Sequence, residues 1–348
     1  MKYLFRLHFK SGVHFGSDDA GFGKEEVQGI AHSDTIFSAL VNTLASVRHV
    51  FHDRPWIDSL LSGKDTRPFK MIPFKLSSFG FVHDNGKQTY YLPKPLTLPK
   101  HLISKDDQIN FGKEFKHRQF ISLNTFKKWQ REEKLNLEKI IQDEKDSFWN
   151  TDVRIQHLTD NTTMATQIYR TGLVFYRENV CPYFIVDLDE KQINFADFIH
   201  LMQMLKHNGL GGRRTAGNGI FDFSDEDWFC LDKSEDTDTE KIINARTDFM
   251  DLFNFQSNAK FLFSLFYPDK MDQNEPVAYN LVLRKGWIYS SSCFDQLKRK
   301  TCYMFSEGSI FSKVSEGKLV DVTPEEFTEH RVYRYGVPFT IPFCEVMP

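Results

Sequence analysis

The apolar residues of this chain change their spacing several times, and each spacing predicts an element. Residues 3–9 alternate between apolar and polar side chains, which predicts a strand. From Ile36 to Val47 apolar residues recur every three or four positions, which predicts a helix with Ser33 or Asp34 as its N-cap. The same reasoning predicts a second helix at 195–207 and further strands at 78–82, 88–92, 183–188 and 219–223.

Two regions interrupt this series. Residues 105–148 are polar and helical in pattern, which is typical of an insertion. Residues 153–177 give two strand patterns around the polar stretch 159–163 and a third after Gly172. This region, mainly 153–172, is predicted to form a projecting β-hairpin.

The order of the predicted elements sets the fold class. Residues 1–224 follow the order β-α-β-β-α-β, which is the ferredoxin-like arrangement of RRM-type RNA binders. Residues 225–348 are predicted to form a second, more degraded unit of this kind. We therefore predict an α+β protein with two ferredoxin-like domains. The strands expected in the second unit are 260–267, 278–284, 287–291, 302–305, 332–335 and 339–343.

A glycine-rich loop between the second helix and the last strand of the first unit carries the clearest chemistry. Five glycines fall within 209–219, together with Arg213 and Arg214 and no acid. Glycines let backbone N–H groups converge on an anion, and guanidinium groups match phosphate oxygens. A P-loop is excluded because Asn218 stands where that motif needs lysine. The competing interpretation is a helix C-cap glycine followed by a flexible turn.

The charge of the chain is small overall but uneven. Its net charge is −3, so an RNA-binding surface would have to concentrate positive charge locally. Residues 94–134 hold ten Lys or Arg against five Asp or Glu, and could face RNA. Residues 225–251 hold ten acids against three bases, which predicts a solvated loop or a surface that repels nucleic acid.

The cysteines and the apolar runs limit which classes of protein the chain can belong to. The five cysteines are scattered without a C-x-x-C pair, which predicts neither a zinc site nor a disulfide framework. The N-terminus lacks the apolar core of a signal peptide, and no apolar run is long enough to span a bilayer. We expect a reduced, cytoplasmic protein without a metal or other cofactor.

Several motifs together resemble those of a known family. The chain resembles the RAMP superfamily of CRISPR proteins and, within it, the Csm subunit 4 family of type III-A effector complexes. The glycine-rich loop marks the superfamily, and the other motifs are more specific. The segments that carry the resemblance are 12–16, 31–40, 91–96, 209–221, 300–311 and 332–336.

This resemblance implies a non-catalytic subunit that holds the 5′ tag of the CRISPR RNA. The implied partners are the CRISPR RNA, the large polymerase/cyclase-like subunit and the repeating backbone subunit of the Csm subunit 3 type. Helix capping is the favoured role for Ser33 or Asp34, although the position of this motif in the family allows an RNA contact. The candidate RNA-binding residues are Gly211, Gly212, Arg213, Arg214, Thr215, Gly217, Asn218, Gly219, His14, His32 and Ser33.

Two other functions stay open at this point. A metal-independent endoribonuclease that processes the CRISPR RNA would use His14 or His32 as its base. A scaffold that binds only proteins is the third possibility. Because neither histidine has an identifiable partner in the sequence, we expect no RNA cleavage by this chain.

Arg331 and Arg334 alternate with Tyr333 and Tyr335 on a predicted strand. This pattern fits either an RNA clamp or an ordinary sheet with buried tyrosines and solvated arginines.

Overall fold

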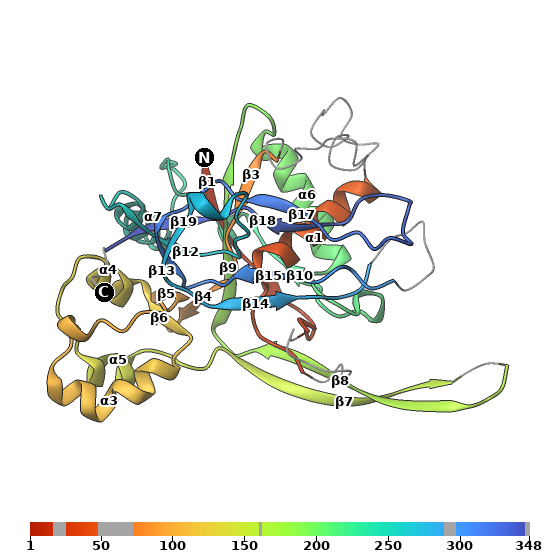
Figure 1. Cartoon of the computed structure of the whole chain (residues 1–348), viewed down its shortest axis with the longest axis horizontal. Helices are drawn as coiled ribbons and strands as arrows, with labels where there is room; N and C mark the ends of the chain where they lie inside the picture. The colour runs from red at the N-terminus through yellow and green to blue at the C-terminus, as the bar shows by residue number, and fades with distance from the viewer. Residues whose placement is uncertain (17–25, 48–71, 160–161, 289–296, 345–348) are drawn as a thin grey trace.

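The largest sheet is antiparallel and runs in the order β11-β1-β9-β4-β5-β6, with β3 also paired to β9 (Figure 1). The structure is a computed structural model that describes residues 1–16, 26–47, 72–159, 162–288 and 297–344. The strands of this sheet are β1 (Lys2–Arg6), β3 (Phe74–Leu76), β4 (Gly80–Asp84), β5 (Gln88–Pro93), β6 (Phe120–Ser122), β9 (Val180–Leu188) and β11 (Trp228–Cys230).

Two helices, α1 (Ser33–Ser46) and α6 (Phe195–Asn208), cover one face of this sheet. Alternation along β1 explains why both faces are buried: Phe5 packs into the core under the two helices, whereas Leu4 belongs to the core on the opposite face. Along the chain, with other elements between them, β1, α1, β4, β9, α6 and β11 give the order β-α-β-β-α-β. The last strand of this order is β11 and not the predicted strand 219–223, of which only β10 (Phe221–Asp222) forms, paired with β2 (His8–Phe9) in a separate sheet. In the sheet the four strands stand in the order β11-β1-β9-β4.

The second half of the chain is built from strands. One sheet has the order β13-β16-β12-β19, and two further pairs join β14 to β15 and β17 to β18. Within the described parts of 259–343 there is no α-helix, so a second β-α-β-β-α-β unit is not confirmed. The bounds are β12 (Ala259–Leu262), β13 (Glu275–Ala278), β14 (Leu281–Arg284), β15 (Cys302–Phe305), β16 (Ile310–Lys313), β17 (Lys318–Asp321), β18 (Tyr333–Gly336) and β19 (Thr340–Phe343). Most of the predicted strand 287–291 lies outside the described residues.

The helices that pack on this second sheet come from earlier in the chain. Phe126 of α4 (Leu123–Gln130) contacts Phe261 and Phe343, with ring centroids 4.9 and 5.1 Å apart. Helix α7 (Glu240–Phe253) contributes Phe253, whose ring lies 6.0 Å from that of Phe339. Buried residues of both halves therefore share one core, and the predicted boundary near residue 225 stays a prediction.

The predicted helical insertion consists of α3 (Lys105–His117), α4 and α5 (Leu137–Asp143), with strand β6 between the first two. The basic and acidic stretches of the sequence meet here. Lys127 of α4 lies 2.7 Å from Asp248 and 3.0 Å from Asp251 of α7, and Arg131 lies 2.5 Å from Asp251. Part of the positive charge that we assigned to an RNA-facing surface is therefore neutralised within the protein. The acidic stretch contains helix α7, so the prediction of a loop throughout it was wrong.

A long hairpin leaves the body of the protein at the foot of the sheet (Figure 1). Its strands are β7 (Trp149–Thr159) and β8 (Thr166–Tyr176), which pair without interruption from Trp149↔Tyr176 to Thr159↔Thr166. The sequence predicted a break between two strands at Gly172, but β8 continues through this residue. Residues 160–161 of the predicted tip lie outside the described residues. The short remaining elements are β2 (His8–Phe9), β10 (Phe221–Asp222), η3 (Lys100–Leu102), η4 (Arg214–Ala216), η5 (Asp225–Asp227) and η6 (Met271–Gln273).

Deleting the hairpin tip, residues 159–163, should leave the fold intact. The described tip residues Thr159, Thr162 and Thr163 are exposed and contribute nothing to the buried core. We expect the melting temperature of the deletion variant to lie within a few degrees of the parent value. Leu173→Ala at the buried foot of the hairpin is the control, and should destabilise the protein by about 2–5 kcal/mol. Loss of soluble expression in the deletion variant would contradict the hairpin assignment.

Candidate nucleic-acid interface

The glycine-rich loop begins where helix α6 ends. Gly209 is the C-cap of α6 with a φ of 76°, and the loop then forms the single turn η4 before strand β10. Four further residues adopt positive φ: Gly211, Arg213, Gly217 and Gly219. Glycine takes this conformation at little cost because it has no Cβ.

The loop packs closely on residues 12–14. The Gly212 N–H donates to the His14 carbonyl at 2.8 Å, and the Gly219 N–H donates to the Gly12 carbonyl at 3.0 Å. A Cβ at Gly212 would lie 2.8 Å from the His14 ring, and one at Gly219 would lie 2.1 Å from the Leu210 carbonyl oxygen. These two glycines thus serve packing within the protein. Gly212 does not have a positive φ, so crowding by His14 and not backbone conformation explains a glycine at this position.

Gly217 is different from the other loop glycines. It has a φ of +79°, yet a Cβ there would meet no described atom within 4 Å. Thr215 and Gly217 are exposed, whereas Arg214 and Asn218 are half-buried. The outer turn of the loop, which also carries Arg214, therefore offers an approachable backbone.

Arg213 connects the loop to the hairpin. Its Nη1 donates to Thr171 Oγ1 at 2.6 Å and its Nη2 donates to Tyr169 Oη at 2.8 Å. The guanidinium also lies over the Tyr169 ring, 5.2 Å from the centroid. These contacts orient β8 relative to the loop.

His14 joins the same two segments. Its Nδ1 lies 2.9 Å from the Gly172 carbonyl oxygen, and because a carbonyl can only accept, Nδ1 carries the proton. The structure thus brings His14, the glycine-rich loop and the foot of the hairpin together.

His32 and Ser33 lie elsewhere, inside the protein. Their exposed fractions are 6% and 0%. His32 Nδ1 lies 2.8 Å from Glu307 Oε1, and Ser33 Oγ accepts a hydrogen bond from the Leu265 N–H at 3.1 Å. We therefore leave both out of the interface. Burial alone would raise the pKa of the Glu307 carboxyl, but His32 and Ser78 outweigh it and hold this pKa below its ordinary value.

Neither Ser33 nor Asp34 is the helix cap that the sequence predicted. The N-cap of α1 is His32, whose side chain makes no capping hydrogen bond. Asp34 is buried and accepts hydrogen bonds from Arg284 Nε at 3.0 Å and Arg334 Nη1 at 2.5 Å. Arg334 is thus neither an RNA clamp nor solvated, and the adjacent Tyr335 is buried as one alternative expected.

The sequence did not reveal Arg284 or Glu307 as partners in these buried pairs. One signal was available: Asp34 lies three residues before the buried Phe37, on the apolar face of α1. An acid on a buried face requires a charged or hydrogen-bonding partner.

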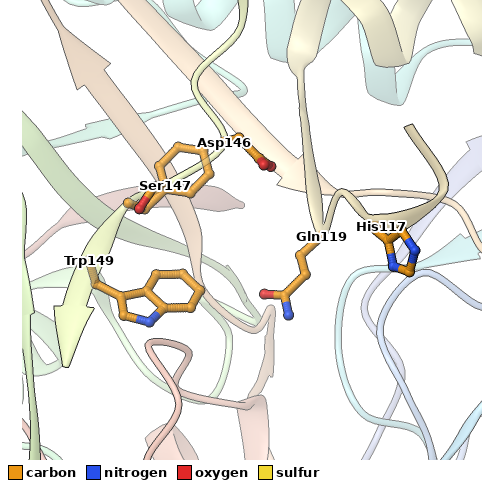
Figure 2. Close-up of a pocket in the computed structure, with 6 residues that line it drawn as sticks. His117, Gln119, Asp146, Ser147 and Trp149 are labelled. Atoms are coloured by element: carbon orange, nitrogen blue, oxygen red, sulfur yellow. The ribbon is translucent and has the colours of Figure 1, made fainter. Parts of the chain in front are cut away.

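A cavity of about 290 Å³ opens at the start of the hairpin (Figure 2). Its walls come from the end of α3, from the segment before β6 and from residues 146–149, which lead into β7. Sequence reasoning did not find this cavity, since its walls are distant in sequence. The lining residues are His117, Gln119, Asp146, Ser147, Phe148 and Trp149.

The described residues give no support to other classes of site. They contain no group of three or more His, Cys, Asp or Glu side chains placed to hold a metal ion. Among these same residues, no helix is both long and apolar enough to cross a membrane.

The chain is similar to known CRISPR proteins. Residues 255–343 match the model of the CRISPR Csm4 C-terminal domain. The chain is 25% identical to the "CRISPR system Cms protein Csm4" of Streptococcus thermophilus, over 97% of this chain and 98% of that protein. It is 26% identical to the protein of the same name from Methanocaldococcus jannaschii, over 55% of this chain and about half, 51%, of that protein.

Solved structures show the same fold. The chain superposes with a TM-score of 0.58 and 20% identity on a chain of the crystal structure of the Csm3-Csm4 subcomplex in the type III-A CRISPR-Cas interference complex, covering 99% of this chain and 100% of that one. It superposes with a TM-score of 0.57 and 15% identity on a chain of the Csm1-Csm4 cassette in complex with AMPPNP, covering 100% of both.

The chain thus has the fold of the Csm4 proteins of CRISPR systems. It resembles one such protein over nearly its whole length, and residues 255–343 match the model of the Csm4 C-terminal domain.

Proposed function

We propose that this chain is an RNA-binding, non-catalytic subunit of a type III-A CRISPR effector complex, which holds the 5′ tag of the CRISPR RNA. The observation that carries the proposal is the outer turn of the glycine-rich loop. Gly217 has open space in front of its backbone, and Arg214 lies on the same turn. Backbone N–H groups and a guanidinium at such a place suit the phosphates of a single strand.

The proposed partners follow from the relatives. Csm4 chains occur with Csm3 in one solved structure and with Csm1 in others. We infer that this chain likewise bridges a large Csm1-type subunit and a Csm3-type backbone subunit. The projecting hairpin would then lie along the RNA, because Arg213 and His14 fix its foot against the loop.

The two candidate histidines differ as possible bases of the endoribonuclease. His32 is buried against Glu307, where RNA does not reach it. The Nδ1 proton of His14 is donated to a backbone carbonyl, which leaves its Nε2 able to accept a proton, so only an experiment separates this function from ours. Mixing the purified chain with repeat-derived RNA separates the three functions. Binding without cleavage supports our proposal, metal-independent cleavage would establish the endoribonuclease, and no binding would leave the scaffold.

Arg214→Gln should weaken binding of tag RNA irrespective of its sequence. A lost phosphate contact lowers the slope of log affinity against log salt by about 0.7 for single strands. Lys191→Gln is a matched control, since this exposed residue precedes the N-terminus of α6, at the opposite end of the helix from the loop. RNA titrations over a range of salt concentrations measure this slope for both variants. Equal slopes for Arg214→Gln and the parent chain would refute the phosphate role of the loop.

A further inference from the structure

A second cavity, of about 220 Å³, lies beside the foot of the hairpin, between strand β2 with the residues after it and the end of β8. Its volume suits a phosphate group with part of its sugar. The residues that line it include Leu7, His8, Lys10, Ser11, Phe175 and Arg177.

The lining of this cavity is positively charged. It contains Lys10, Arg177 and His8 but no acid. Lys10 and Arg177 form no ion pair with any other residue that the structure describes, and both are exposed. Their charge is therefore available to a ligand.

His8 adds to this charge. Its Nε2 lies 2.8 Å from Asp227 Oδ1, and this hydrogen bond raises the pKa of His8 to about 10. His8 is thus protonated at neutral pH. Asp227 carries one negative charge and also pairs with Arg6 at 3.3 Å. Asp227, Arg6 and protonated His8 together therefore keep a net positive charge. The nearby Asp222 is held by Lys206 at 3.1 Å.

Further positive charge lies behind Arg177. The pKa of Lys145 is lowered by burial and by the proximity of Arg177. Lys145 in turn contributes, after burial, to lowering the pKa of His83. The electrostatic field at this side of the hairpin foot therefore favours an anion.

The cavity and the glycine-rich loop lie along one surface. Ser11, which lines the cavity, accepts a hydrogen bond from the Ile220 N–H at 3.2 Å, immediately after Gly219 of the loop. On the hairpin side, alternate residues of a strand face the same way. Thr171, which receives Arg213, therefore shares its face of β8 with Phe175 of the cavity.

From this continuity we propose that the cavity binds a backbone phosphate of the RNA strand whose neighbouring phosphates lie on the glycine-rich loop. The inference rests on the proposed function and extends it to a second contact. Lys10, Arg177 and protonated His8 would hold the phosphate oxygens, with Ser11 at the wall toward the loop. The Phe175 ring would flank the sugar, and the strand would pass from the loop across the foot of the hairpin.

The test is RNA binding by the full chain carrying Lys10→Gln with Arg177→Gln. We expect the slope of log affinity against log salt to fall by up to about 1.4, at about 0.7 for each lost contact. The matched control is Lys191→Gln with Lys313→Gln, which removes the same charge from two exposed positions that do not line the cavity and should leave the slope unchanged. Melting temperatures confirm that both double variants are folded.

The outcomes separate this inference from the proposed function. If Arg214→Gln lowers the slope and the cavity variant does not, the cavity proposal is refuted while the proposed function stands. If the parent chain binds no tag RNA, both are refuted. Adenosine monophosphate serves as a competitor: displacement of RNA from the parent chain at equal phosphate concentration would show a site for free nucleotides instead of a strand.

Discussion

Asp34→Asn is expected to destabilise this protein by about 3–5 kcal/mol, although asparagine has almost the same shape as aspartate. Asp34 is 2% exposed, and its carboxylate is the counter-charge for two buried guanidinium groups. Arg284 and Arg334 are 250 and 300 residues away in sequence, so the cluster joins the first helix to the second half of the chain. Removing one partner from a buried ion pair leaves a charge without compensation.

A third arginine makes this substitution more severe. The pKa of Arg299 is lowered to about 10, first by burial and then by the proximity of Arg334. The cluster thus already holds more positive than negative charge. Without Asp34, the repulsion among its guanidinium groups is no longer offset.

Urea unfolding at neutral pH measures the effect. The control is Asp152→Asn, which breaks an ion pair of 2.9 Å between Asp152 and Arg154, both 52% exposed. An exposed pair contributes only up to about 1 kcal/mol. Similar losses in the two variants would contradict a structural role for the Asp34 cluster.

The free energy of unfolding at acid pH gives a second test of the role of Asp34. Burial alone would raise the pKa of Asp34, but Arg284 and Arg334 outweigh it and hold the pKa well below its ordinary value. A carboxyl whose pKa is depressed by folding stabilises the protein fully above its unfolded pKa. This stabilisation is lost as the pH falls below about 4. Asp34→Asn should therefore flatten the loss of stability at acid pH.

The sequence predicted those elements whose apolar spacing is regular over many residues. Helices α1 and α6 each present apolar residues every three or four positions, and both were found. Strands β3 and β11 have only three residues, too few for an alternation to be recognised. Helix α7 was missed because its many charges hid the spacing of Ile242, Ala245, Phe249 and Leu252.

The candidate site was predictable only in its local part. The glycines and arginines of the loop are adjacent in sequence, so their convergence could be proposed without coordinates. The contacts of Arg213 with Tyr169 and Thr171 could not be predicted, because these residues lie about 40 positions away in sequence. The burial of His32 and Asp34 could not be predicted either, because it depends on Glu307 and Arg334 at the far end of the chain. Long-range pairing leaves little trace in the pattern of one sequence.

Two loop glycines allow backbone strain to be separated from crowding. Gly217 and Gly219 have nearly the same φ, +79° and +77°. A Cβ at Gly217 would enter open space, whereas one at Gly219 would lie 2.1 Å from the Leu210 carbonyl oxygen. An alanine at either position would carry the same penalty for a left-handed conformation, about 1–2 kcal/mol. Any difference in the free energy of unfolding between the two alanine variants therefore comes from packing alone.

We therefore expect Gly219→Ala to destabilise the protein by at least about 2 kcal/mol more than Gly217→Ala. The clash of the new Cβ with the Leu210 carbonyl oxygen would break two hydrogen bonds, from Leu210 N–H to Gly219 and from Gly219 N–H to Gly12, which close the loop onto residues 12–14. Gly217→Ala should keep this closure and lower RNA affinity, because its methyl group lies on the side where a phosphate would approach. Denaturant unfolding and RNA titration of both variants provide the comparison. Equal stability of the two variants would show that the loop relaxes around Gly219, and undiminished RNA affinity in Gly217→Ala would place the phosphate elsewhere.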